Sequence, residues 1–318
     1  MHSLSVVVEW DNVRYYEVAR ATRMLQRLVD QLGGLAAAPA ARPSAEILVL
    51  YDEEAINAAT VNRALDGFVG RLPAGVELRG VGTRGLRYYQ LKNEGARRGT
   101  GEIILFADSD VLPEDGWLAE LLAPFEDPAV HAVIANAYID RDSLYSKTFA
   151  LAWYFPARAE DGPLAVTRSS MVNSMAIRRT TFTRFPFPDD RELYIQQCVA
   201  WARNLRAHGI EIHRNPRARI AHPPPSFLRS ALIQGHDTIV TYQRRAGRSP
   251  AWRTTYWSLR SQLAGSLAAV VRDHRAVGLP RAAIPLAIGI ATTYYVLWAL
   301  SEWATRWRPG IVRRLYGI

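Results

Sequence analysis

The stretch Gly101-Glu-Ile-Ile-Leu-Phe-Ala-Asp-Ser-Asp-Val111 decides the fold that this sequence predicts. Its apolar run, residues 103–107, ends abruptly at two aspartates one residue apart, Asp108 and Asp110. Because the run is rich in β-branched and aromatic residues and is bounded by a glycine and a proline, we expect a buried strand. Two carboxylates at the end of such a strand repel each other unless a cation lies between them. Mg²⁺ or Mn²⁺ suits oxygen ligands and also binds phosphate, so the pattern predicts a metal–diphosphate site. On spacing alone, a turn that caps the next helix explains the two acids equally well.

Apolar runs and helical patterns alternate on both sides of this stretch. The alternation predicts an α/β, Rossmann-like fold, with a mostly parallel sheet flanked by helices. Ligands of such sheets bind beyond the carboxyl ends of the strands, so the acids of residues 9–11, 52 and 108–110 are expected on one rim. The expected strands are residues 4–8, 46–51, 76–81, 103–107 and 130–135, and the expected helices are 13–32, 55–70, 88–99 and 115–125.

The pattern is weaker after residue 140. Residues 191–208 have helical spacing, and Gly209 is expected to end that helix. Short strands are expected at residues 210–212 and 218–221. His222 follows the second of these and precedes three prolines, which form a rigid exit from the sheet.

Composition narrows the classes of protein to which the chain can belong. The 318 residues fit one large domain or two smaller ones, and a hydrophobic content of 49% is too low for a polytopic membrane protein. The net charge of +9 fits anionic headgroups or nucleotides, while the lack of zinc-finger or RNA-recognition signatures argues against nucleic acid. The single cysteine, Cys198, excludes an intrachain disulfide. With no signal-peptide pattern at the start, we expect a cytoplasmic protein.

The C-terminal region has a different character. Residues 282–301 contain no charged side chain, which is about the length that spans a bilayer. Arginines flank both ends of this segment, so they give no orientation across a membrane. We expect residues 246–318 to be helical, with the apolar helix lying in the headgroup region at the inner face of the cell membrane. The alternatives are a true span and a buried hairpin that packs on the rest of the chain or on a twin subunit in a homodimer.

With its strand-end acids in place, the chain resembles the family 2 glycosyltransferases of the GT-A fold over residues 4–245. Ser5-Val-Val-Val-Glu-Trp-Asp-Asn12 occupies the place of the family's first strand, although Glu9 and Trp10 replace its usual proline and threonine. Glu46-Ile-Leu-Val-Leu-Tyr-Asp52 looks like the second strand, whose last aspartate binds the base. Lys92-Asn-Glu-Gly95 is similar to a segment whose basic residue approaches the nucleotide. The resemblance implies nucleotide binding by Glu9, Trp10, Asp52, Lys92 and Asp108.

The metal-binding motif of that family is matched by Asp108-Ser-Asp110. Pro216-Arg-Ala-Arg-Ile-Ala-His222 looks like the family segment whose histidine completes the metal shell. The resemblance therefore implies that Asp108, Asp110 and His222 hold Mg²⁺ or Mn²⁺.

The chain departs from the family pattern at the general base. The family has Glu-Asp about three helical turns before the glycine that ends the acceptor-side helix. Counting back from Gly209 gives Gln197-Cys198 at this place. The nearest acids are Asp189, Asp190 and Glu192, of which Asp190 is the best candidate for the base and Glu192 the next. Asp189 and Asp190 would also fit as caps of a helix that begins at residue 191.

The resemblance implies an inverting, metal-dependent transfer of a hexosyl or related sugar from a nucleotide-diphosphate sugar. The acceptor would be a hydroxyl of a glycan, a lipid-linked sugar or a small molecule, in cell-envelope or secondary glycan synthesis. We expect a glycosyltransferase domain at residues 1–245, with a nucleotide half (1–136) and an acceptor half (137–245). A methyltransferase-like Rossmann enzyme is disfavoured because no glycine follows the first strand. The remaining alternative is a non-catalytic relative that binds a nucleotide sugar or a glycan.

Overall fold

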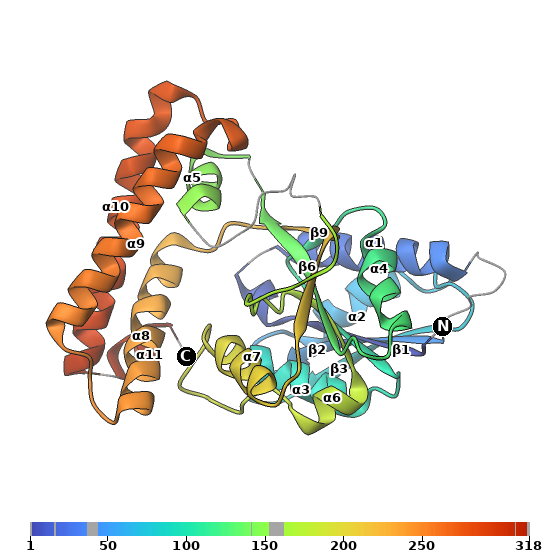
Figure 1. Cartoon of the computed structure of the whole chain (residues 1–318). Coiled ribbons are helices and arrows are strands. Elements are labelled where there is room, and N and C mark those ends of the chain that lie inside the picture. Colours follow the sequence, from blue (N-terminus) through green and yellow to red (C-terminus); the bar gives the residue numbers. More distant parts are fainter. Residues whose placement is uncertain are drawn as a thin grey trace. The chain divides into compact units, whose positions relative to one another are not determined.

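The computed structural model describes residues 2–15, 17–36, 44–140, 142–152, 162–308 and 310–316. The chain forms two compact units whose segments interleave along the sequence. The first unit comprises residues 1–137, 158–189 and 198–222, and the second comprises residues 138–157, 190–197 and 223–318. Figure 1 labels their helices and strands.

The first unit is built on one sheet with the strand order β3-β2-β1-β4-β8-β6-β9-β5, and β7 pairs with β9. The first four strands in that order are parallel, whereas β8 pairs antiparallel with β4 and β6, and β9 pairs antiparallel with β5 and β7. The strands are β1 (Leu4–Glu9), β2 (Ala45–Asp52), β3 (Val76–Thr83), β4 (Ile103–Asp108), β5 (Leu112–Pro113), β6 (Ala132–Ile139), β7 (Ala165–Val166), β8 (Ser174–Arg178) and β9 (Ile212–His222).

Helices cover both faces of this sheet, which confirms the expected α/β class. In Figure 1, α1 and α4 lie on one face, and α3, α6 and α7 lie on the other. The helices of the unit are α1 (Val18–Ala36), α2 (Ala58–Asp66), α3 (Tyr88–Arg98), α4 (Trp117–Leu122), α6 (Arg179–Arg184) and α7 (Gln197–Ala207).

The register of the parallel strands brings the acidic strand ends together. Glu9 lies opposite both Leu50 of β2 and Asp108 of β4. Asp52, the last residue of β2, lies opposite Thr83 at the end of β3. The expectation that the acids share one rim is therefore confirmed, because parallel strands paired in step end at the same edge.

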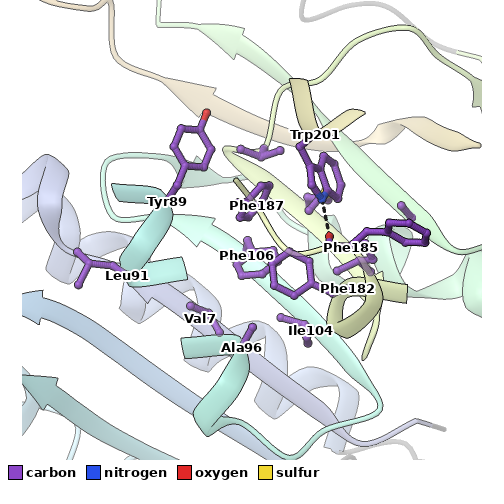
Figure 2. Close-up of a cluster of buried hydrophobic side chains, with 14 of the residues drawn as sticks. Val7, Tyr89, Leu91, Ala96, Ile104, Phe106, Phe182, Phe185, Phe187 and Trp201 are labelled. Carbon is purple, nitrogen blue, oxygen red and sulfur yellow. Dashed lines mark hydrogen bonds between the residues drawn. The ribbon is translucent and has the colours of Figure 1, made fainter. Parts of the chain in front are cut away.

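An aromatic core fixes the face of the sheet that carries α3, α6 and α7 (Figure 2). The ring centroid of Phe187 lies 5.4 Å from that of Phe106, 5.1 Å from that of Phe182 and 5.0 Å from that of Trp201. The indole N–H of Trp201 donates to the carbonyl of Phe185 at 2.8 Å. Trp201 is 1% exposed, so its ring packs in the core.

Two glycines of the motifs quoted above are required by close packing. A Cβ atom at Gly101 would lie 2.4 Å from the backbone nitrogen of Ser5 on the neighbouring strand. A Cβ at Gly95 would lie 2.3 Å from a methyl group of Val7, where α3 crosses the sheet. Any larger residue would push β4 or α3 away from β1, and with them the acidic strand ends.

Several elements differ from their predicted bounds. α1 starts at Val18 and continues through Gly33 and Gly34, past the predicted end at residue 32, because burial of Leu28 and Leu32 outweighs the cost of about 1 kcal/mol per glycine. The predicted helix 115–125 is α4 followed by a 3₁₀ turn, and the two short strands predicted within residues 210–221 form one strand, β9.

The segment before α7 is the largest difference from the predicted bounds. The helix expected at residues 191–208 begins only at Gln197, so Asp189 and Asp190 do not cap a helix that starts at residue 191. Residues 191–196 form turns instead. Their backbone N–H groups find a partner in a side chain of the second unit, the Asp237 carboxylate, which accepts from residues 194–196.

The second unit is helical. Its helices are α5 (Leu144–Ala152), α8 (Phe227–Ala246), α9 (Trp252–Asp273), α10 (Ile284–Trp307) and α11 (Gly310–Tyr316). α8 and α10 cross closely at Gly235, where a Cβ would lie 2.5 Å from the carbonyl oxygen of Trp298. Among the described residues, one helix, Arg281–Trp307, is long and apolar enough to cross a membrane, but part of it is buried against its neighbours.

Candidate metal and nucleotide site

The predicted metal ligands meet at the ends of two strands of the first unit. Asp108 ends β4, Asp110 follows two residues later, and His222 ends β9. One ligand atom from each of the three lies within 4.8 Å of the others. Nε2 of His222 is 3.9 Å from Oδ2 of Asp110. The sheet order places β9 several strands away from β4, so the sequence alone could not show this proximity.

Asp108 is held by donors from three directions. The hydroxyl of Tyr88 lies 2.8 and 2.7 Å from its two oxygens, and Nδ2 of Asn173 donates to Oδ2 at 2.9 Å. Nζ of Lys92 donates to Oδ1 at 2.6 Å, and it also donates to the Tyr88 hydroxyl and to the carbonyl of Val172. Lys92 is fully buried. Its ammonium therefore orients Asp108, and its direct contact with a nucleotide stays a prediction.

Asp110, the second acid of the pair, lies between the loop after β1 and the end of β9. Nδ2 of Asn12 donates to its Oδ1 at 3.3 Å. Burial raises the pKa of Asp110 above its usual value; His222 opposes this rise and Asp108 adds to it. A bound cation would remove the penalty for ionising these neighbouring buried carboxyls. Two carboxylates and an imidazole that converge in this way fit a divalent ion such as Mg²⁺ or Mn²⁺.

Sequence reasoning missed Arg20. From α1, its Nε donates to the backbone carbonyl of Asp110, and its Nη2 donates to the carbonyl of Ala221 at 3.3 Å. Arg20 thus ties the segment that carries Asp110 to the segment that carries His222. In the sequence it is one arginine among many on a predicted helix, and only the contact identifies it.

Glu9 and Trp10 are both fully buried. The Glu9 carboxylate accepts from the backbone N–H of Asp11 at 2.8 Å and from Nδ2 of Asn12 at 3.1 Å. Burial, with Asp108 adding to it, raises the pKa of Glu9 well above its usual value. Glu9 therefore shapes the loop after β1 and holds Asn12, which reaches Asp110. The predicted nucleotide contacts of Glu9 and Trp10 remain predictions.

Asp52 lies at the rim in a network of its own. Its Oδ2 accepts from Nη2 of Arg14 at 3.0 Å, and its Oδ1 accepts from the backbone N–H of Gly85 at 2.9 Å. Arg14 also pairs with Asp11 at 3.1 Å, so it joins the loops that follow β1 and β2. The sequence prediction did not include Arg14, a part-buried cation at the rim where a base or phosphate is expected.

The candidate bases Asp190 and Glu192 belong to the second unit. Arg244 forms ion pairs with both of them, and Arg313 pairs with Glu192 at 3.2 Å. Asp189 lies in the first unit, where its Oδ1 accepts from the side chain of Gln90. Because these contacts do not test catalysis, the choice of Asp190 as base stays a prediction.

Residues 81–185 match the family model described as Glycosyl transferase family 2. No curated protein sequence matches the chain. The mannosyltransferase PcManGT from Pyrobaculum calidifontis, solved with GDP-Man and Mn²⁺, has a similar structure with a TM-score of 0.58 and 17% identity, covering 96% of this chain and 87% of that one.

Two further solved structures are similar at lower scores. S. aureus TarS 1–349 has a TM-score of 0.51 and 14% identity, covering 96% of this chain and 91% of that one. GalNAc-T7 with UDP, GalNAc and Mn²⁺ has a TM-score of 0.52 and 15% identity, covering 70% of this chain and 44% of that one. At these identities the likeness establishes the fold, which is GT-A-like.

Proposed function

We propose that this chain, whose residues 81–185 match the family 2 glycosyltransferase model and whose fold is GT-A-like, moves a sugar from a nucleotide-diphosphate sugar to an acceptor hydroxyl, with inversion. The observation that carries the proposal is the convergence of Asp108, Asp110 and His222 at the carboxyl rim of the sheet. Mn²⁺ with a guanosine or uridine nucleotide in two structural relatives supports a donor of this class.

Asp110 and His222 would hold the divalent ion, with Asp108 beside them. When bound, that ion would stabilise the negative charge that develops on the departing diphosphate. Lys92, Tyr88 and Asn173 fix the Asp108 carboxylate, so little reorganisation is needed when the donor binds. Asp52 would read the base at the same rim.

Asp190, or else Glu192, would accept the proton of the acceptor hydroxyl as it attacks the anomeric carbon. Each is a carboxylate held by arginine contacts in the second unit. Asp190→Asn keeps the size of the side chain and removes its capacity to take a proton, so it separates catalysis from binding.

We further propose that the enzyme works at the inner face of the cell membrane. One side of α10 presents an exposed stripe at residues 286, 289, 293, 296, 300, 303 and 307, which are spaced three or four residues apart. Its large apolar side chains leave 51–69% of their surface accessible. The members of the stripe that are large and apolar are Leu286, Val296, Leu300, Trp303 and Trp307. Arginines flank the helix, which suits an anionic bilayer surface, and tryptophans are favoured at such interfaces. A second copy of the chain is the competing occupant of the stripe.

The activity is tested with purified protein, a panel of nucleotide sugars, and Mn²⁺ or chelator. We expect one UDP- or GDP-linked donor to raise the melting temperature and to be hydrolysed slowly, with both effects lost in chelator and in Asp110→Ala. Asp115→Ala, an exposed acid near the same strand end, is the control and should behave like the wild type. Absence of any nucleotide-dependent shift would refute the proposal, and binding without turnover would instead indicate a non-catalytic relative.

A further inference from the structure

A histidine–aspartate pair lies inside the second unit, on α8. His236 and Asp237 are both fully buried, and Nδ1 of His236 is 3.1 Å from Oδ1 of Asp237. The other oxygen of Asp237 accepts from the backbone N–H groups of Tyr194, Ile195 and Gln196 at 3.0, 2.6 and 3.1 Å. These three donors fix the carboxylate as an acceptor, so Nδ1 of His236 is the donor in the pair.

This arrangement leaves the other ring nitrogen of His236 as an acceptor. Nε2 is buried and has no hydrogen-bond partner among the described residues. An acceptor left unpaired in the interior costs about 1–3 kcal/mol, so a group that donates to it is expected. His236 lines a cavity of about 350 Å³ together with Glu192, Val240, Gln243, Arg244 and Arg313. That volume is within the range of about 300–1,000 Å³ that is typical of small-molecule sites.

The charges around the cavity indicate which class of ligand it takes. Both arginines already have acidic partners: Arg244 pairs with Asp190 and Glu192, and Arg313 pairs with Glu192. A phosphate or carboxylate would therefore meet compensated guanidinium groups and the repulsion of Glu192. A neutral hydroxyl both donates and accepts, so it matches a wall that offers an imidazole acceptor, a carboxylate, an amide and guanidinium donors.

We propose that this cavity binds a neutral saccharide, with one sugar hydroxyl donating to Nε2 of His236. Glu192 accepts from a second hydroxyl, and Arg313 and Gln243 donate to ring or hydroxyl oxygens. The inference rests on the proposed function, because the saccharide is then the acceptor, and it names the acceptor class as an uncharged sugar. Binding at this cavity uses residues of the second unit alone, so it requires neither the metal nor the nucleotide.

The test uses the full chain without metal or nucleotide, labelled with ¹⁵N at histidine. Methyl glycosides of glucose, galactose, mannose and N-acetylglucosamine are titrated separately, with inorganic phosphate in a parallel arm. We expect at least one glycoside to shift the Nε2 resonance of His236 saturably. By saturation-transfer NMR, His236→Phe and Arg313→Gln should weaken that binding by about tenfold or more, whereas the exposed neighbour variant Arg314→Gln should bind like the wild type.

Three results would overturn the inference. The first is no shift of Nε2 with any glycoside up to about 100 mM, a concentration that detects even weak affinity. The second is a shift with phosphate alone, which would make the cavity an anion site. The third is glycoside binding that neither His236→Phe nor Arg313→Gln weakens. A nucleotide-dependent thermal shift that survives any of these results would leave the proposed function standing, whereas glycoside binding without a nucleotide shift would count against that function alone.

Discussion

Replacing Lys92 with methionine tests whether this lysine stabilises Asp108 through a buried ion pair or contacts the nucleotide. The Lys92 side chain is 0% exposed and the Asp108 side chain 1%, with Nζ and Oδ1 2.6 Å apart. Removing one partner of such a buried pair costs about 3–5 kcal/mol, because the remaining charge stays in the interior. The Val172 carbonyl would lose a donor as well. Since a domain has about 5–15 kcal/mol of stability in total, Lys92→Met should be severely destabilised.

The assay is urea unfolding followed by tryptophan fluorescence. Arg98→Met is the matched control, since Arg98 is on the same helix and its ion pair with Glu94 is near the surface. That change should cost about 1 kcal/mol or less. The double variant Lys92→Met/Asp108→Asn should regain part of the loss, because a neutral amide is less costly to bury than an unpaired carboxylate. If Lys92→Met unfolds at the same urea concentration as the wild type but loses nucleotide affinity, the reasoning is refuted and Lys92 is a ligand contact.

Three other outcomes are expected. Arg20→Met should lower Mn²⁺ affinity by about ten- to a hundredfold in a paramagnetic-resonance titration, because it removes the hydrogen bonds that join the backbone at Asp110 to β9. The exposed Arg23→Met is the control and should leave the affinity unchanged. Equal affinities of the two variants would contradict this role of Arg20. Burial raises the pKa of Glu302 to about 7. Below the unfolded pKa near 4.5 the carboxyl is neutral in both states and costs no stability. As pH rises through 7 the folded state loses stability, because the unfolded state ionises the carboxyl more readily. Glu302→Gln should therefore match the wild type near pH 4 and be more stable by about 3 kcal/mol near pH 8, and parallel pH profiles of thermal unfolding would rule this out. Changing both tryptophans of the exposed stripe of α10 to glutamate should abolish sedimentation with anionic vesicles, while Val69→Glu on the first unit should not; binding retained in the double variant would exclude the stripe as the membrane contact.

Local patterns were enough to predict the parallel half of the sheet. The run at residues 103–107 is apolar throughout because β4 is buried on both faces, and its aspartates follow because the chain there reaches the rim. Parallel strands paired in step end together, so the shared edge of Glu9, Asp52 and Asp108 could be predicted without a structure. Helix ends were less certain, as α1 and α7 show, because packing and remote hydrogen bonds override local breakers and caps.

The sequence by itself determined the strand-end acids and the class of fold, since these depend on short-range periodicity and on the chemistry of each side chain, whereas His222 was expected as a metal ligand only through the family resemblance. Only the tertiary structure decided which groups surround them. Lys92 proved to be buried beneath Asp108, Arg20 to join the Asp110 and His222 segments, and His236 to line a cavity with a free acceptor. Such contacts join residues far apart along the chain, and their hydrogen bonds and burial depend on how distant elements pack, which no local pattern encodes.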